Sequence, residues 1–294
     1  MLQNTKNNIY YVKIILALNL ILCNAIPANS RDNPHSLTAP THEAQTAALE
    51  NNTAGMGYGP QSPRDLSLKN GSNKRVFNPA PSSTRMNLCN IHFHKNAEHK
   101  GGEFTAFAGK GDGHGNETGY KYAGRLSARE TRMLDTPVCV GKHGGLQSGD
   151  TVELHYVYST AQVTPGPSLN ACLSETQVNP QLRVEALVLV LVNDPNAADF
   201  TQLTLVGETH GYQQALNMPK NMGQPISYAG STTGPSYNDK GSPLQVSWNV
   251  RPKVMKVNAP SLGQWCKGNP FNEDHAHGVR KLVTQENMLS PIRP

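Results

Sequence analysis

The 294-residue sequence predicts a mainly β fold, and three features lead to that prediction. Residues 90–94 and 151–158 alternate apolar and polar side chains with a period of two, which is typical of strands with one buried face. Residues 183–192, RVEALVLVLV, are rich in β-branched side chains and fit a fully buried central strand. Helix-like stretches are few, around residues 127–134 and 259–266. We therefore expect a single β-dominated domain with long loops.

Two other stretches depart from regular strands. Residues 245–257 are expected to form two short strands broken at Pro252, because proline cannot donate a hydrogen bond to a sheet. Residues 29–85 are rich in Asn, Pro, Ser, Thr and Ala and show no sustained period of 3.6 or 2. Such a stretch buries little apolar surface, so we expect it to be extended or partly disordered.

The N-terminus has the pattern of a secretory leader. Lys6 and Lys13 precede the apolar run of residues 14–22, which is too short to span a bilayer. Small residues follow, with Ala28 at the end of a loose cleavage site. This order predicts a signal peptide over residues 1–28 that is removed before folding.

These features divide the chain into a signal peptide (1–28), a flexible N-terminal arm (29–57) and a folded domain (58–294). Export predicts a periplasmic or secreted protein, with no membrane span in its mature form. The net charge of +5 is mild, and no dense run of Lys and Arg with interleaved aromatic residues appears. A nucleic-acid partner is therefore not expected. The sequence carries no signal for an oligomeric state.

Cysteine usage agrees with export. Of the five cysteines, Cys23 falls in the leader and four remain in the mature chain. An even number in an exported protein predicts two disulfides with three possible pairings. A four-thiolate zinc site is the alternative, but no C-x-x-C pair is present to form it. Among the pairings we expect Cys89–Cys139 and Cys172–Cys266.

Two histidines on one predicted strand suggest a metal site. Side chains two residues apart point to the same face of a strand, so His92 and His94 project together. Catalytic zinc uses three protein ligands and leaves one position for water. His155, in the alternating run 151–158, is the best candidate for the third ligand.

Polar neighbours strengthen this interpretation, because H-x-H alone is common by chance. Metal-bound histidines usually donate their second ring N–H to an amide or a carboxylate. Asn90 precedes His92 by two residues, and Glu153 precedes His155 by two, so each could orient its imidazole.

Two other histidine patterns in the sequence offer alternatives to a zinc site at His92, His94 and His155. His275 and His277 form a second H-x-H, but no strand pattern surrounds them, and we expect an exposed loop. The order His92, His94, Glu98 also resembles the cupin barrels, which bind iron or manganese, although the second cupin motif is missing. A cupin-type metal enzyme therefore stays an alternative.

The stretch CNIHFHKNAEHKGGEF at 89–104 resembles the delta-class carbonic anhydrases and their alpha-class relatives. The alpha-class signature has an amide-x-His-x-His strand followed by a Ser-Glu-His turn. Further similar blocks follow the family's order: GPQSPRDL at 59–66, ELHYVY at 153–158, YAGSTTGPS at 228–236 and VSWNV at 246–250. Two departures are a longer gap before His155 and a Gly-Pro pair where the family has two prolines.

The resemblance implies an alpha-carbonic-anhydrase-like domain built on a large, twisted, mostly antiparallel central sheet with a few short helices. It implies reversible hydration of CO₂ to bicarbonate and a proton by hydroxide on a Zn²⁺ ion. Glu98 and Thr233 would together orient the hydroxide, with Thr232 as the alternative if the loop shifts by one. CO₂ and bicarbonate would be the small-molecule partners.

The resemblance also implies an apolar wall beside the metal, at Val157, Val246 and Trp248. The family's proton-shuttle histidine has no counterpart, and four candidates stay open: His99, His114, His143 and His210. A non-catalytic carbonic anhydrase-like binding protein is the remaining alternative. The presence of histidine at all three ligand positions speaks against it.

Overall fold

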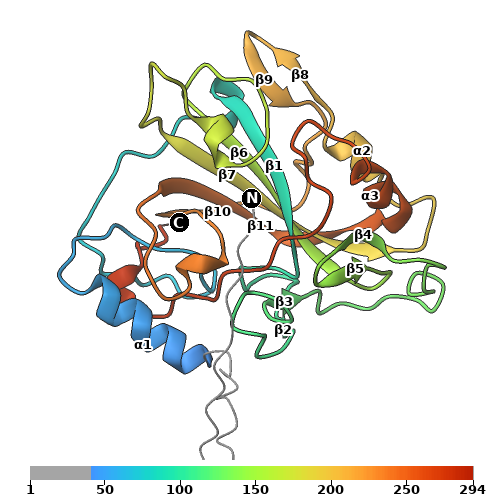
Figure 1. The fold of residues 1–294 in the computed structure, drawn as a ribbon, viewed down its shortest axis with the longest axis horizontal. Helices are drawn as coiled ribbons and strands as arrows, with labels where there is room; N and C mark the ends of the chain where they lie inside the picture. The colour runs from blue at the N-terminus through green and yellow to red at the C-terminus, as the bar shows by residue number, and fades with distance from the viewer. Residues whose placement is uncertain (1–40, 294) are drawn as a thin grey trace, which may run out of the picture. The chain divides into compact units, whose positions relative to one another are not determined.

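A five-stranded sheet forms the centre of the computed structural model, which describes residues 41–293 (Figure 1). The predicted signal peptide, residues 1–28, lies outside the described residues. The strands run in the order β1-β6-β7-β11-β10. Their bounds are β1 Asn87–Lys95, β6 Thr151–Ser159, β7 Leu182–Val192, β10 Ile226–Ser231 and β11 Gln245–Asn258.

The sheet is mixed but mostly antiparallel, as predicted. β1 pairs with β6, β6 with β7, and β10 with β11 in antiparallel fashion, and only the β7–β11 pairing within this sheet is parallel. β7 lies in the middle and is buried along its length except at Arg183. The long β-branched run therefore is the central strand, and the prediction of a mainly β fold is confirmed.

Pro252 lies inside β11 and does not end it. β11 is continuous, whereas we expected two separate strands. The predicted break appears as a shift in register with β7 between Val250 and Val254. Glu103 satisfies the interrupted ladder there, because its N–H donates to the Pro252 carbonyl and its carboxylate accepts from the Val254 N–H.

Helices are few and short, but one was not expected. Helix α1, His42–Thr53, occupies part of the predicted flexible arm, so the expectation of extended chain is wrong there. Thr41 caps the helix, and Leu49 packs with Val283, Met288 and Leu289. This tertiary contact stabilises a helix whose own sequence lacks a periodic apolar face.

The two helices predicted from the sequence have different outcomes. α3, Ala259–Trp265, confirms the expectation for residues 259–266, whereas residues 127–134 form only a turn. The remaining elements are α2 Phe200–Leu203, β2 Ala106–Phe107, β3 Tyr120–Lys121, β4 Val138–Gly141, β5 Gly144–Leu146, β8 Val206–Thr209, β9 Tyr212–Ala215 and the 3₁₀ turns η1 Ser83–Arg85, η2 Leu169–Cys172, η3 Pro235–Tyr237 and η4 Glu286–Met288. Within residues 41–293, no helix has the length and apolar character needed to cross a bilayer.

The two faces of the sheet bury different side chains. On one face, Phe93 and other apolar residues of β1, β6 and β7 pack against Phe200 of α2 and Trp265 of α3. The other face carries Val184, Ala186 and Trp248 together with the three histidines predicted to bind metal. The apolar face therefore packs the sheet against α2 and α3, and the opposite face carries the predicted metal ligands.

The four cysteines form two disulfides, as predicted, but with different partners from those expected. The structure joins Cys89 to Cys172 and Cys139 to Cys266, so the expected pairing of Cys89 with Cys139 and Cys172 with Cys266 is wrong. η2 folds back onto β1, and β4 packs on α3, which brings each pair together. Long intervening loops decide these contacts, and their paths are not visible in the spacing of the cysteines.

Candidate metal centre

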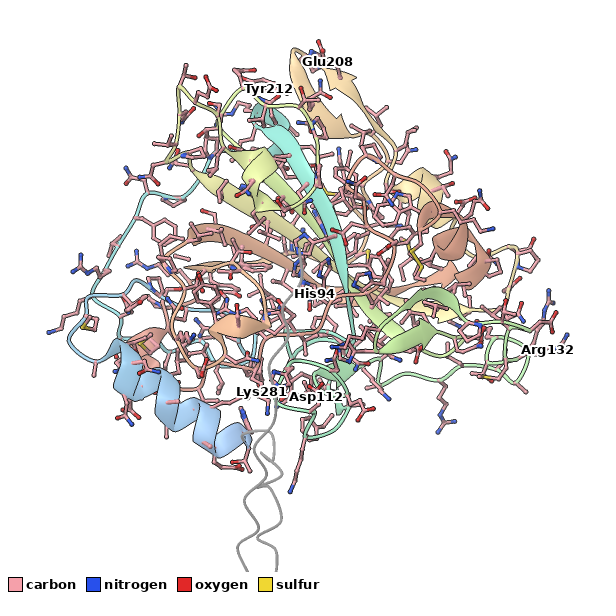
Figure 2. All side chains as sticks on the ribbon, in the orientation of Figure 1. His94, Asp112, Arg132, Glu208, Tyr212 and Lys281 are labelled. Carbon is pink, nitrogen blue, oxygen red and sulfur yellow. A yellow bond between two sulfur atoms is a disulfide. The ribbon has the colours of Figure 1, made fainter. Side chains whose placement is uncertain are left out.

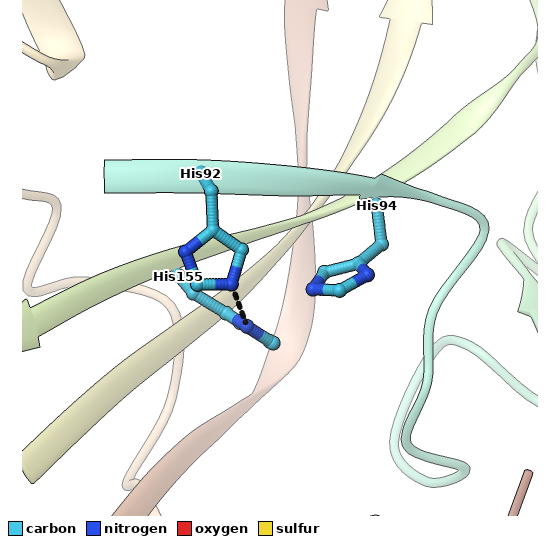
Figure 3. Close-up of side chains that lie close together, drawn as sticks. All are labelled: His92, His94 and His155. Atoms are coloured by element: carbon cyan, nitrogen blue, oxygen red, sulfur yellow. Dashed lines mark hydrogen bonds between the residues drawn. The ribbon is translucent and has the colours of Figure 1, made fainter. Parts of the chain in front are cut away.

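The pairing of β1 with β6 brings the three predicted histidines together. His92 and His155 are direct partners across the two antiparallel strands, and His94 is two residues further along β1. One ring nitrogen from each of the three residues lies within 4.8 Å of the others (Figure 3). Figure 2 shows His94 well inside the molecule, whereas Glu208 and Arg132 lie at its edge.

Each imidazole is oriented by an acceptor on its outer side. His92 Nδ1 lies 2.6 Å from Asn90 Oδ1, and His94 Nδ1 lies 2.9 Å from the Gly278 carbonyl oxygen. His155 Nε2 lies 2.9 Å from Glu153 Oε1. Because each outer nitrogen faces an acceptor, it carries the proton and the inner nitrogen keeps its lone pair. Two of the inner nitrogens, His155 Nδ1 and His92 Nε2, are 3.2 Å apart.

The electrostatics of the cluster favour neutral imidazoles. Burial and the neighbouring rings hold the pKa of His92 well below its usual value. Burial lowers the pKa of His94 to about 4, even though Glu98 acts in the opposite direction. Both rings are therefore neutral at pH 7 and can offer lone pairs to a metal.

One nitrogen of the cluster lacks a partner. His94 Nε2 is buried and makes no hydrogen bond to any described residue. An unsatisfied buried polar atom is costly, and such atoms in native proteins call for an explanation. Three imidazoles with one nitrogen each turned inward are a donor set that suits zinc, so the residues fit the predicted ion.

Glu153 connects the histidine cluster to a buried hydrogen-bond network. Its Oε1 accepts from both His155 Nε2 and His99 Nδ1, the latter at 2.6 Å, and its Oε2 accepts from the Glu98 N–H at 2.7 Å. Burial acts to raise the pKa of Glu153, but His99 and His155 together lower it well below the usual value. Glu153 is therefore ionised and holds its two imidazoles in place.

His99 has a different place from the one considered for it. Its side chain is fully buried, and its Nε2 lies 2.6 Å from the Tyr228 hydroxyl. With both ring nitrogens bonded inside the protein, His99 cannot carry protons to solvent. His114, His143 and His210, the other shuttle candidates, are exposed and lie outside the imidazole cluster.

Glu98 borders the imidazole cluster, with its Oε1 3.6 Å from His94 Nδ1, and Thr233 lies in a separate segment of the chain. Glu98 is buried, and its Oε1 accepts from the Arg280 N–H at 2.8 Å. Thr233 is partly exposed in the loop after β10, and Thr232 is buried with its N–H bonded to the Leu244 carbonyl. No hydrogen bond between Glu98 and either threonine is present among residues 41–293, so their pairing stays a prediction.

The predicted apolar wall lies on the histidine face of the sheet. Val157, Val246 and Trp248 are all buried in the same apolar cluster. Val157 and Trp248 both pair with Val184 from opposite sides of β7. The Trp248 ring centroid lies 5.1 Å from that of His155, so its indole borders the imidazole cluster directly.

His277 is the residue that sequence reasoning missed. It forms a backbone bridge with His94, and its ring centroid lies 5.8 Å from that of His92. Its Nε2 is 2.6 Å from Glu273 Oε2, a hydrogen bond that raises the pKa of His277. The side chain is 42% exposed, whereas His275 points to solvent beside Asp274. The H-x-H spacing of His275 and His277 was visible in the sequence. No strand pattern surrounds these residues, so the sequence did not indicate that His277 lies beside β1.

A family model described as delta carbonic anhydrase matches residues 83–261. The match covers more than half of the chain and includes His92, His94, Glu98 and His155. The chain belongs to the delta carbonic anhydrase family. It is therefore a carbonic anhydrase, an enzyme that interconverts CO₂ and bicarbonate. The cupin alternative is wrong, because the histidines lie on an open five-stranded sheet and not in a barrel.

Three solved structures show weaker similarity. A hyperthermostable carbonic anhydrase from an active hydrothermal vent chimney is 15% identical, with 81% of this chain and 90% of that chain covered and a TM-score of 0.31. The alpha-carbonic anhydrase of Thermovibrio ammonificans, in complex with the inhibitor sulfanilamide, is 16% identical, with 82% of this chain and 89% of that chain covered and a TM-score of 0.28. The alpha-carbonic anhydrase of Photobacterium profundum is 15% identical, with 82% of this chain and 94% of that chain covered and a TM-score of 0.29. No curated protein matches the chain. The family assignment therefore rests on the family model.

Proposed function

We propose that this carbonic anhydrase hydrates CO₂ at a zinc ion held by His92, His94 and His155. The observation that carries the proposal is the orientation of the three rings. Each outer nitrogen faces its own acceptor, the inner nitrogens converge, and His94 Nε2 is buried without a partner. Zinc bound there would lower the pKa of a water ligand from about 15.7 to near 7 and so supply the nucleophile.

Glu98 would orient the nucleophile through a threonine. Its Oε1 is held by the Arg280 N–H, which leaves Oε2 to accept a proton from a hydroxyl group. We assign that hydroxyl to Thr233, with Thr232 as the alternative. A threonine that donates to Glu98 has only its oxygen lone pairs left, so it must accept the next hydrogen bond and thereby fix the direction of the nucleophile.

The apolar wall would hold the substrate. CO₂ has no net dipole and gains little from polar contacts, so an apolar surface beside the metal suits it. Val157, Val246 and Trp248 provide such a surface on the histidine face of the sheet. Their burial also excludes water from the side on which CO₂ approaches.

The released proton needs a path to solvent. His277 is close to the cluster and partly exposed, and Glu273 accepts a hydrogen bond from its Nε2. An imidazole that exchanges protons near neutral pH can take up a proton on the cluster side and release it to buffer. We therefore assign proton transfer to His277, with Glu273 as the residue that orients it.

The two disulfides support a location in an oxidising compartment. Together with the predicted leader of residues 1–28, they lead us to propose a periplasmic or secreted enzyme.

Stopped-flow CO₂ hydration on the mature chain, with metal content measured on the same sample, tests the proposed function. We expect zinc bound to the chain and a hydration rate far above buffer. A chelator should remove both, and added zinc should restore both. A zinc-loaded sample that hydrates CO₂ no faster than buffer contradicts the proposal.

A further inference from the structure

A cavity lies beside β10, at the edge of the central sheet, and its lining takes residues from both faces of that sheet. Its volume is about 410 Å³, and it is lined by residues of the segments 73–79 and 290–293 and of the strands β7, β10 and β11. Ser247 and Asn249 alternate with Trp248 along β11, so their side chains point away from the metal centre. Tyr228 and Trp248 also line the cavity and belong to the histidine face, whereas Arg75 and Ser247 have no role in the proposed CO₂ chemistry.

Hydrogen-bond donors are among the side chains that line this cavity. Ser247 is buried and its Oγ accepts from the Ala80 N–H at 2.8 Å, which leaves its own O–H free to donate. Arg183 is anchored by bonds from Nε and Nη2 to the carbonyls of Pro81 and Ala80. Its Nη1 lies 4.0 Å from Glu185 Oε1, a longer and weaker contact than the other two.

The charge around the cavity is positive. Arg75, Arg183 and Arg293 line it, and no aspartate or glutamate of the described chain does. The ion pairs within residues 41–293 join neither Arg75 nor Arg293 to a carboxylate. Guanidinium groups without acidic partners attract anions, and their forked donors match carboxylate and phosphate oxygens.

The cavity also has an apolar side. Phe77, Pro79 and Pro291 line it, and Val76 at its rim is 91% exposed. Its volume lies within the range of about 300–1,000 Å³ that is usual for small-molecule sites. We propose that this cavity binds a small organic anion. The anionic head would meet the guanidinium groups and the Ser247 hydroxyl, and an apolar ring or short chain would pack on Phe77.

Calorimetric titration of the zinc-loaded mature chain with benzoate tests this assignment. Benzoate should bind, and Arg75→Glu should weaken its affinity about tenfold or more, as expected for loss of a charge-assisted contact. The matched control is Arg125→Glu, which makes the same charge change at an exposed arginine away from the cavity. It should leave the affinity within about twofold. CO₂ hydration should be unchanged in both variants.

Two further ligands separate the parts of the proposed site. Benzyl alcohol lacks the charge and inorganic phosphate lacks the ring, so each should bind more weakly than benzoate. Phe77→Ala should reduce the affinity for benzoate but not for phosphate. Phosphate that binds as tightly as benzoate would overturn the organic part of the assignment.

Three results would overturn the site itself. They are no binding of benzoate to the unaltered enzyme at millimolar concentration, equal weakening by Arg75→Glu and Arg125→Glu, and binding that survives both Arg75→Glu and Ser247→Ala. Benzoate displaced by a sulfonamide at the metal, with no effect of Arg75→Glu, would place the anion at the zinc instead.

Discussion

Nε2 of His155 lies 2.9 Å from Oε1 of Glu153, and this carboxylate is fully buried between β1, β6 and β7. The bond turns Nδ1 of His155 toward His92 and makes that nitrogen the proposed ligand atom. Glu153 accepts three further hydrogen bonds, from His99 Nδ1 and from the N–H groups of Glu98 and His99. One side chain therefore fixes a proposed ligand and the segment that carries Glu98.

Glu153→Gln should weaken zinc binding about 10- to 100-fold, the usual effect of losing a carboxylate behind a metal-bound histidine. The amide keeps the shape of the side chain but loses the charge that holds the two imidazoles. Competition with a chromophoric chelator measures the affinity. The matched control is Glu185→Gln on β7, a buried glutamate bonded to Asn249 and away from the histidines. Equal zinc affinity in the Glu153→Gln variant and the unaltered enzyme would remove Glu153 from this role.

His94→Ala should abolish both metal binding and CO₂ hydration, because His94 contributes the one inner nitrogen that is buried without a partner. His155→Ala should have the same effect. Zinc content after dialysis and the stopped-flow rate give the two measurements. His210→Ala, at an exposed histidine outside the cluster, is the control and should change neither. Full zinc occupancy in the His94→Ala variant is incompatible with the proposed ligand set.

Glu98→Gln should keep zinc but lose about 10²-fold or more in hydration rate, because the proposed threonine loses the acceptor that orients its hydroxyl. Thr233→Val and Thr232→Val then identify the threonine, since only the correct one should match the loss. Rates are measured on samples with equal zinc content. Loss of zinc from Glu98→Gln would instead make Glu98 a ligand.

Local patterns in the sequence predicted the parts of the site that lie on strands. The period of two placed His92 and His94 on one face, and the β-branched run identified β7 as the central strand. The i−2 spacing also predicted the bonds from Asn90 to His92 and from Glu153 to His155, which the structure contains.

Features that depend on long loops could not be predicted in this way. His277 reaches β1 only because the C-terminal segment pairs with it, through hydrogen bonds to the backbone of Phe93 and Lys95. The disulfide partners and the stability of α1 likewise depend on contacts between residues far apart in sequence. None of these contacts leaves a periodic pattern.

His277→Ala should lower the hydration rate in dilute buffer while zinc content stays unchanged, because proton release then depends on water. Added imidazole should restore the rate by carrying the proton in place of the missing side chain. His275→Ala removes an exposed histidine two residues away and should have no such effect. A rate that falls in the His277→Ala variant but does not respond to imidazole would mean that the residue is only structural.

The disulfide between Cys89 and Cys172 closes a loop with a sequence separation of 83, and it joins η2 to the strand that carries His92 and His94. Replacing both cysteines by serine should lower the free energy of unfolding by about 4 kcal/mol, because a crosslink across a long loop restricts the unfolded chain. Urea unfolding of the oxidised enzyme and of the double variant gives this difference. Mass spectrometry of a non-reduced digest should find the Cys89 peptide linked to the Cys172 peptide. A link from Cys89 to Cys139 would contradict the structure.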